Sequence, residues 1–344
     1  MIHLIGDFCT AYGLGPLLAE PASVSGGLMH AMYRVKTAQG EYAVKILNAD
    51  IMKRPTAYQN MVNSEITSNA LKGVVPLVAA RAFGGKHVIE FKGAFWMVFD
   101  WLEGHSIFPP DLTAQHCARV GDLLGRIHAA DLRVDTMACD TGIRQPFAWR
   151  ELLNAARQEN PKCFALLQEH WDAIIAWDDQ LVVSWPLMQR HQVISHRDLD
   201  PKNILWQDGQ PFIIDWEAAG YVNPAQELVE ALNYWMIEPD GHYSREKFDA
   251  MQSAYAAHMD LSGTDWKAVL SAGYAGMLGW LEYNAKRAAG LEGSAETDRA
   301  EGIAQVQQTL QELYRYQQQM DQLGSWMTNN EKTVRTVKHT VRTV

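Results

Sequence analysis

The chain has 344 residues, of which 47% are hydrophobic and 20% charged, with a formal net charge of -10 at pH 7. This length predicts two lobes rather than one core, and the ordinary composition argues against disorder of the whole chain. The negative charge disfavours a nucleic-acid partner, because binding to a phosphate backbone needs a concentrated basic surface.

The amino-terminal residues lack a basic segment followed by an apolar one, so we expect no signal peptide. No run of about 18 apolar residues occurs, and a membrane span is therefore not expected. The four cysteines are far apart and form no CxxC pair, which favours reduced thiols over disulfides or zinc ligands. Together these features predict a cytoplasmic protein without a membrane partner.

Residues 1–99 are expected to form a small lobe of antiparallel sheet with one helix. Short β-rich runs alternate there with turns, and a helix is expected over 58–71. The runs that predict strands are 32–35, 42–47, 74–75, 86–91 and 94–99. The turn 37–40 between the first two runs predicts a hairpin.

Residues 105–327 are expected to form a mainly helical lobe, because apolar residues recur there at spacings of three and four. Helical faces are expected near 120–128, 151–157, 165–177 and from 224 to about 323. One hairpin interrupts them, with strands at 204–206 and 212–214 around an Asp-Gly turn. The fold class predicted is therefore α+β and bilobal, with a hinge over 100–104 and a disordered tail over 328–344.

The strongest chemical signal is the segment 196–203, His-Arg-Asp-Leu-Asp-Pro-Lys-Asn, which fits the kinase catalytic-loop pattern H-R-D-L-x-x-x-N. An isolated His-Arg-Asp is usually only a charged turn. Here Asn203, a hairpin and then Asp215 follow it, and the full set favours a catalytic loop. Phosphoryl transfer needs a carboxylate at the attacking hydroxyl and oxygen ligands for Mg²⁺. We therefore expect Asp198 to take the hydroxyl proton, and Asn203 and Asp215 to hold Mg²⁺. His196 is expected to have a structural role.

A nucleotide site is expected upstream of this loop. Lys45 lies in a predicted strand, in the V-A-I-K context where a lysine contacts phosphates and pairs with a helix glutamate, for which Glu65 is the best candidate. Ahead of it, the segment Ser25, Gly26 and Gly27 would let backbone N–H groups approach phosphate, although without Lys45 behind it a plain turn would explain the segment equally well. The hinge backbone at Asp100 and Leu102 would bind a purine edge, with an ordinary core strand as the alternative.

These residues together make the chain resemble the aminoglycoside phosphotransferase and choline kinase group, over roughly residues 20–320. Leu-Gly-Arg-Ile-His at 124–128 and Ile-Asp-Trp-Glu at 214–217 add to the resemblance. It implies a protein-kinase-like fold, ATP or GTP with Mg²⁺ in the interlobe cleft, and a small hydroxylated acceptor bound by helices of the second lobe.

Departures from kinase patterns bear on the substrate. Asp-Trp-Glu stands at 215–217 where protein kinases have Asp-Phe-Gly, and no Ala-Pro-Glu follows, which disfavours a protein substrate. Lys202 resembles the cation that steadies the transferring phosphate in some kinases, and a solvent-facing lysine is equally plausible. A kinase-fold pseudoenzyme is the competing class of function, but Lys45, Asp198, Asn203 and Asp215 are all present.

The acceptor stays open. An aminoglycoside or other antibiotic, with a role in antibiotic resistance, would need carboxylates near the cleft, and an amino alcohol or a sugar is an alternative. Candidate acceptor residues are Glu217, Glu230, Trp280 and Glu282, each of which is more often structural at such spacing.

Overall fold

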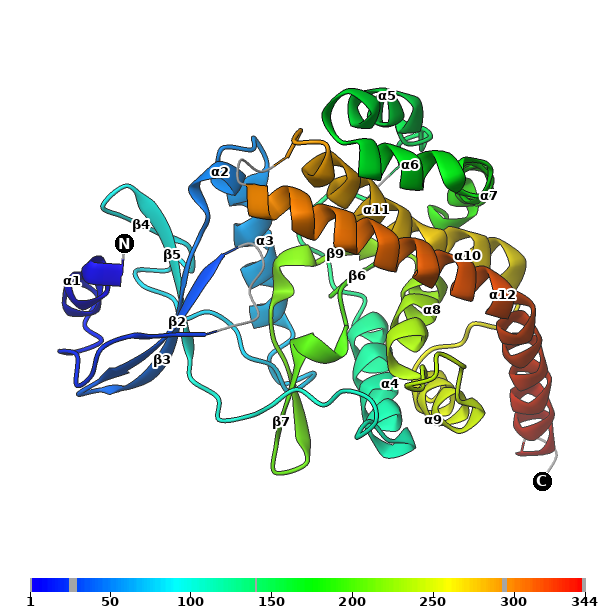
Figure 1. Ribbon diagram of the computed structural model, residues 1–344. Coiled ribbons are helices and arrows are strands. Elements are labelled where there is room, and N and C mark those ends of the chain that lie inside the picture. Colours follow the sequence, from blue (N-terminus) through cyan, green and yellow to red (C-terminus); the bar gives the residue numbers. More distant parts are fainter. Residues whose placement is uncertain (1, 25–29, 140, 293–295, 342–344) are drawn as a thin grey trace.

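The computed structural model describes residues 2–24, 30–139, 141–292 and 296–341, and from residue 330 onward only the backbone. An antiparallel sheet forms the amino-terminal lobe, and most of the remaining chain is helical (Figure 1). The predicted bilobal α+β fold is confirmed. The lobe boundaries at residues 99 and 104 stay predictions.

The sheet of the first lobe has five strands in the order β1-β2-β3-β5-β4, all antiparallel. The strands are β1 (Ala22–Ser23), β2 (Ala31–Thr37), β3 (Gly40–Ile46), β4 (Ile89–Phe91) and β5 (Ala94–Asp100). The expected hairpin is formed by β2 and β3, and β5 pairs with β3 so that Lys45 stands opposite Met97. The strand expected at 74–75 is only an isolated bridge between Lys72 and Val75.

Helix α3 (Ala57–Ala70) is the one helix expected in this lobe, and two more accompany it, α1 (Ile5–Ala11) and the short α2 (Ala49–Met52). Helix α1 was not predicted. Its Phe8 is fully buried and stacks on Trp96 of β5, with ring centroids 4.9 Å apart. Seven residues give too short a periodic pattern for recognition, so packing against the sheet determines this helix.

The second lobe contains α4 (Ala114–Ala129), α5 (Trp149–Glu159), α6 (Pro161–Glu169), α7 (Trp171–Met188), α8 (Pro224–Trp235), α9 (Arg245–Ala256), α10 (Trp266–Ala272), α11 (Tyr274–Ala288) and α12 (Glu296–Val341). Asn223 begins α8 as its cap, because its side chain accepts hydrogen bonds from the N–H groups of Ala225 and Gln226. The helical pattern expected over 165–177 is two helices, α6 and α7, which meet at His170.

Three short strands complete the second lobe: β6 (Val193–Ser195), β7 (Ile204–Gln207) and β8 (Gln210–Ile213). The pair β7 and β8 is the expected hairpin. A fourth strand, β9 (Gly220–Val222), was not predicted and pairs with β6. The two pairs frame the segment 196–203 and Asp215.

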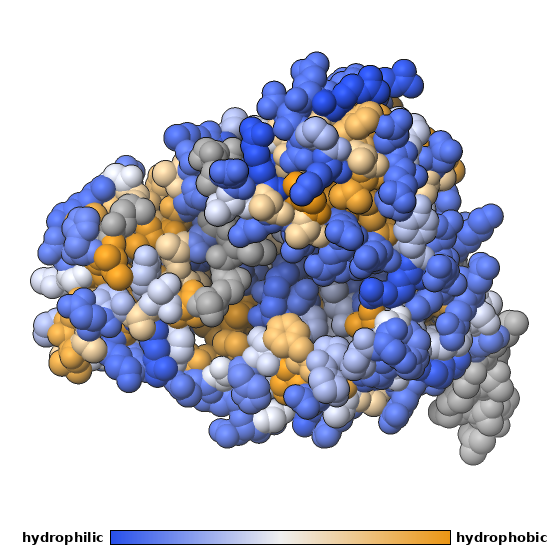
Figure 2. All heavy atoms as spheres, in the orientation of Figure 1, coloured by the Kyte–Doolittle hydropathy of each residue, from blue (hydrophilic) through white to orange (hydrophobic). Residues whose placement is uncertain are grey.

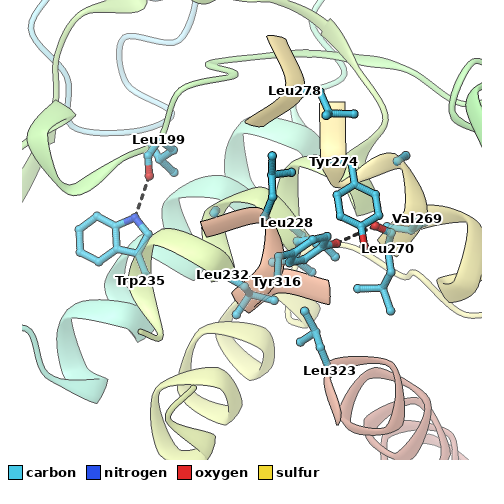
Figure 3. Close-up of a cluster of buried hydrophobic side chains, with 14 of the residues drawn as sticks. Leu199, Leu228, Leu232, Trp235, Val269, Leu270, Tyr274, Leu278, Tyr316 and Leu323 are labelled. Atoms are coloured by element: carbon cyan, nitrogen blue, oxygen red, sulfur yellow. Dashed lines mark hydrogen bonds between the residues drawn. The ribbon is translucent and has the colours of Figure 1, made fainter. Parts of the chain in front are cut away.

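The core of the second lobe includes buried side chains of α8, α10, α11 and α12, part of which Figure 3 shows. Figure 3 shows Leu228 and Leu232 of α8 beside Tyr316 of α12. The indole of Trp235, fully buried at the end of α8, donates a hydrogen bond of 2.7 Å to the carbonyl of Leu199. The loop at 196–203 is therefore anchored directly to the hydrophobic core.

Helix α12 continues through 328–341, within the segment expected to be a disordered tail. The sequence there has no apolar stripe at helical spacing, so the order of this tail in solution stays a prediction. Among the described residues, no helix combines the length and apolar character that crossing a membrane requires. The four cysteines are free thiols, and Cys9, Cys117 and Cys163 are buried.

Candidate active site

The candidate site is built on two unusual backbone positions. Arg197 and Asp215 have φ angles of 65° and 58°, in the left-handed region that residues other than glycine rarely adopt. Each such residue costs on the order of 1–3 kcal/mol, so surrounding contacts must hold it. At Arg197 the backbone N–H donates a hydrogen bond of 2.6 Å to Oε1 of Glu227.

Glu227 is buried beneath the loop at the start of α8. Its Oε2 lies 2.7 Å from Nε2 of His128, and the other ring nitrogen of His128 lies 2.8 Å from the hydroxyl of Tyr255. Burial would raise the pKa of Glu227, but the hydrogen bond and charge of His128 outweigh it and hold the pKa below its ordinary value. This network connects α4, α8 and α9 to the backbone that precedes Asp198.

Asp198 and Asn203 are held together. Nδ2 of Asn203 donates hydrogen bonds to the carbonyl of Asp198 at 2.8 Å and to its Oδ2 at 2.9 Å. His196 is buried and its Nε2 donates to the carbonyl of Ile214 at 2.9 Å, in keeping with a structural role. The loop therefore fixes the Asp198 carboxylate against the strand that leads to Asp215.

The donor set fits a hard divalent cation. Because the amide nitrogen of Asn203 is used by Asp198, its amide oxygen is the atom left to bind a cation, and Asp215 contributes a carboxylate. Nζ of Lys202 lies 3.5 Å from a carboxylate oxygen of Asp198 and of Asp200. Burial lowers the pKa of Lys202, but these two carboxylates raise it overall, so the ammonium stays charged.

Lys45 reaches the same place from the first lobe. Its Nζ lies 2.9 Å from Oδ1 of Asp215 and 2.7 Å from Oε2 of Glu217. Burial, the largest influence, would lower the pKa of Lys45, but the two carboxylates raise it. In turn Lys45 outweighs the effect of burial on Asp215 and lowers the pKa of that carboxyl, whereas burial keeps the pKa of Glu217 raised.

The pair expected between Lys45 and Glu65 does not form among the described residues. Glu65 is buried in α3, and its Oε2 accepts hydrogen bonds from the N–H of Ala80 at 2.7 Å and the hydroxyl of Ser68 at 3.2 Å. The expectation is corrected because local donors occupy Glu65 while Lys45 is drawn to two carboxylates. Burial raises the pKa of Glu65 despite these hydrogen bonds.

His30 is a buried residue of this site that the sequence analysis missed. Its Nδ1 accepts a hydrogen bond of 3.0 Å from the N–H of Asn48, and its Nε2 lies 3.4 Å from Oε2 of Glu217. Burial and then the charge of Lys45 lower the pKa of His30 to about 4, so the ring is neutral near pH 7. No motif in the sequence marks this histidine.

The segment 100–104, expected to be a hinge, begins at the last residue of β5. The N–H of Trp101 donates to the carbonyl of Glu41 at 3.0 Å, and the Asp100 carboxylate pairs with Arg81 at 2.7 Å. Asp100 and Leu102 both line the interlobe cleft, and their role at a purine edge stays a prediction. Ser25, Gly26 and Gly27 lie outside the described residues.

A single cleft of about 1780 Å³ joins these groups to the helical lobe. Figure 2 shows it as a hollow between the lobes, with hydrophilic residues on much of the visible wall. One half is lined by Lys45, Asp198, Asn203 and Asp215, and the other by α8, α11 and α12. Its volume exceeds the roughly 300–1,000 Å³ of common small-molecule sites, so it has room for two ligands side by side.

Glu230 of α8 is one of several acidic residues that line the second half, together with Asp298, Glu301 and Glu312 of α12. No hydrogen bond or ion pair to Glu230 exists within the described part of the chain, and its Oε1 lies 2.7 Å from where a Cβ on Gly276 would stand. Burial, and then the charge of Glu227, raise its pKa to about 8. Trp280 lines the same half and stacks on Tyr283, with centroids 5.5 Å apart.

Two other acceptor candidates lie elsewhere. Glu217 belongs to the Lys45 cluster. Glu282 does not line the cleft and pairs with Lys286 at 3.0 Å. The reason is geometric, because positions 280 and 282 of one helix point to different sides. Of the four acceptor candidates, Glu230 and Trp280 therefore line the second half of the cleft.

Several known proteins are similar to this chain in sequence or in fold. Residues 22–261 match the model of the family described as "Phosphotransferase enzyme family". Homoserine kinase of Xanthobacter autotrophicus is 29% identical over 269 residues, which cover 76% of this chain and 78% of that protein.

Two solved structures share the fold at low identity. Spectinomycin phosphotransferase, determined with ADP and spectinomycin, has a TM-score of 0.66 at 12% identity and covers 92% of this chain and 99% of its own. Choline kinase from Cryptosporidium parvum has a TM-score of 0.57 at 14% identity and covers 95% and 100%.

Proposed function

Because the chain belongs to the phosphotransferase enzyme family, whose model matches more than half of it, we propose that it moves the γ-phosphoryl group of ATP or GTP to a hydroxyl of a small molecule. The observation that carries the proposal is the convergence of Asp198, Asn203, Lys45 and Asp215 on one cleft. Phosphoryl transfer requires a carboxylate at the attacking hydroxyl, ligands for the metal ion and a cation at the phosphates, and it requires little covalent chemistry from the protein.

In the proposed reaction, Asp198 accepts the proton of the acceptor hydroxyl while that oxygen forms a bond to the γ-phosphorus and the bond to the β-phosphate oxygen breaks. Asn203 orients the carboxylate by its hydrogen bond of 2.9 Å. Lys202, within 3.5 Å of that carboxylate, would steady the transferring phosphoryl group. Lys45 would bind the phosphates.

We propose Mg²⁺ as the metal, held by Asn203 and Asp215 through oxygen. When bound, it neutralises charge that develops on the phosphate oxygens. The nucleotide base would lie at the hinge, against the backbone of Asp100 and Leu102, with Ser25, Gly26 and Gly27 at the phosphates.

For the acceptor we propose a hydroxylated molecule with a protonated amine, bound near Glu230 and Trp280. Support comes from Glu230, which has no hydrogen-bond or ion-pair partner in the described part of the chain and whose raised pKa a bound ammonium group would lower, and from Trp280 in the same half of the cleft. The homoserine kinases among the relatives make a hydroxylated amino acid the first compound to test, ahead of aminoglycosides and other antibiotics. Amino alcohols and sugars are the next compounds to test. We propose the cytoplasm as the location of the enzyme.

The test is a coupled assay for ADP or GDP formation with Mg²⁺ against a panel of L-homoserine, ethanolamine, choline, spectinomycin and sugars. Asp198→Asn should abolish acceptor-dependent turnover while leaving nucleotide affinity unchanged. The exposed Asp208→Asn, in the β-hairpin turn, is a matched control that should keep full activity. Retained turnover in Asp198→Asn would overturn the proposed mechanism.

Two alternatives give different results in the same experiment. A kinase-fold pseudoenzyme would bind nucleotide, and no acceptor in any panel would stimulate turnover. A protein kinase would label a peptide library and none of the small molecules.

A further inference from the structure

His30 has a buried ring nitrogen without a hydrogen-bond partner. The residue is 7% exposed, and it precedes β2 on the wall of the cleft. Its Nε2 has no hydrogen-bond partner among the described residues. Leaving a buried polar group unsatisfied costs about 1–3 kcal/mol, so such an atom in a binding cleft points to a missing ligand.

The contact with Asn48 determines what this nitrogen can do. Because the backbone N–H of Asn48 donates to Nδ1 at 3.0 Å, Nδ1 carries no hydrogen. The hydrogen of the neutral ring is therefore on Nε2. His30 is thus a fixed, uncharged donor whose N–H faces the cleft groups rather than the sheet.

The surroundings identify the chemistry of the partner. Nε2 lies 3.4 Å from Oε2 of Glu217 without forming a hydrogen bond to it, and that oxygen accepts a hydrogen bond of 2.7 Å from Lys45. Lys45 and Asp215 are also the groups that would receive the phosphates and their metal. A ligand group that accepts a hydrogen bond from Nε2 there would carry acceptor oxygens. A phosphate group has such oxygens, whereas a purine base bound at the hinge would lie at the other end of the cleft.

We propose that Nε2–H of His30 donates a hydrogen bond to a phosphate oxygen of the bound nucleotide, next to Lys45. This assignment rests on the proposed function, since it assumes that nucleotide phosphates occupy this half of the cleft. His30 is then a nucleotide-binding residue, and its bond with Asn48 orients the ring.

Two substitutions separate the two nitrogens. In His30→Asn the side-chain oxygen stands near the place of Nδ1 and keeps the bond to Asn48, but the distal donor is lost. In His30→Gln the amide nitrogen reaches the place of Nε2 and keeps that donor. His87→Asn is the matched control, because His87 is a half-buried histidine of the same lobe that does not line the cleft.

The experiment measures the Kd of ADP with Mg²⁺ and of adenosine for the full chain and each variant by calorimetry. His30→Asn should weaken ADP binding about tenfold to a hundredfold, as expected for one hydrogen bond to a charged group, and leave adenosine binding unchanged. His30→Gln should restore most of the ADP affinity, and His87→Asn should bind both ligands like the wild type.

Unchanged ADP affinity in His30→Asn, or an equal loss for ADP and adenosine, would overturn the inference. His30 could instead affect ADP binding indirectly, through Glu217. To test this, His30→Asn is repeated in a Glu217→Gln background, and if His30→Asn no longer weakens ADP binding there, a direct phosphate contact is refuted. If the wild type binds neither ADP nor GDP, the proposed function itself fails, which separates the two failures.

Discussion

The ionisation of Glu230 gives the sharpest quantitative prediction. This carboxyl has a pKa of about 8 in the folded protein, because burial and the nearby Glu227 disfavour its charge, against an ordinary value of 4.5. Between those two values the unfolded chain has lost a proton that the folded chain still binds. Folding stability of the wild type should therefore fall as the pH rises through this window.

The magnitude follows from the two pKa values. At 1.36 kcal/mol for each pH unit, the window between 4.5 and about 8 corresponds to about 5 kcal/mol, as an upper limit because the cleft admits solvent. Glu230→Gln removes the titrating group and keeps the shape. The stability difference between variant and wild type should therefore grow in favour of the variant from pH 4.5 to pH 8 and level off above it.

The assay is urea denaturation of both proteins at half-unit pH steps from 5 to 9, followed by fluorescence of the buried tryptophans. Glu282→Gln is the matched control, since Glu282 lies on α11 outside the cleft and pairs with Lys286. It should track the wild type at every pH. A stability difference between Glu230→Gln and the wild type that does not vary with pH would contradict a raised pKa of Glu230.

Further predictions concern the support of the loop and the packing of the second lobe. Glu227→Ala should cost about 3–5 kcal/mol in urea denaturation, because the buried His128 loses its carboxylate partner and the N–H of Arg197 loses its acceptor; an unchanged midpoint would contradict this. Folding lowers the pKa of Glu227, so the ionised Glu227 stabilises the folded state above its ordinary pKa, and this stabilisation is lost as the pH falls through the pKa of the folded protein. Glu227→Gln should therefore make the folding stability less dependent on pH on the acid side. Gly121→Ala would put a Cβ at only 2.2 Å from the carbonyl oxygen of Met251, so α4 and α9 must separate, and the variant should lose about 1–3 kcal/mol or more. A melting temperature equal to that of the wild type would show that this close packing does not matter.

Local chemistry in the sequence was enough to indicate the centre of the site. Asp198, Lys202 and Asn203 occur within six residues, so their spacing already restricts them to one turn, and the Asp-Gly hairpin after them directs Asp215 back to the same edge. The structure brings these residues together as expected, although their roles stay predictions. The β2–β3 hairpin and α3 could be predicted for the same reason, because their patterns are local.

Hydrogen-bond and ion-pair partners that are distant in the sequence could not be predicted from local patterns. Glu65 has the right residue type and helix for a pair with Lys45, yet the N–H of Ala80 is its partner and Lys45 pairs with Asp215, 170 residues away in the chain. His128 and Glu227 are separated by 99 residues and meet only because α4 and α8 pack beneath one loop. Sequence spacing contains no information on such distances.

The class of chemistry can thus be inferred without the fold, since it depends on residue types at short fixed separations. Which carboxylates line the cleft depends instead on how distant helices pack. Glu230 and Glu282 look alike in the sequence, but α8 turns the first toward α11 while the second pairs with Lys286 outside the cleft. His30 has no motif at all, and it becomes a donor in the site because the Asn48 backbone fixes its ring and burial leaves one N–H without a partner.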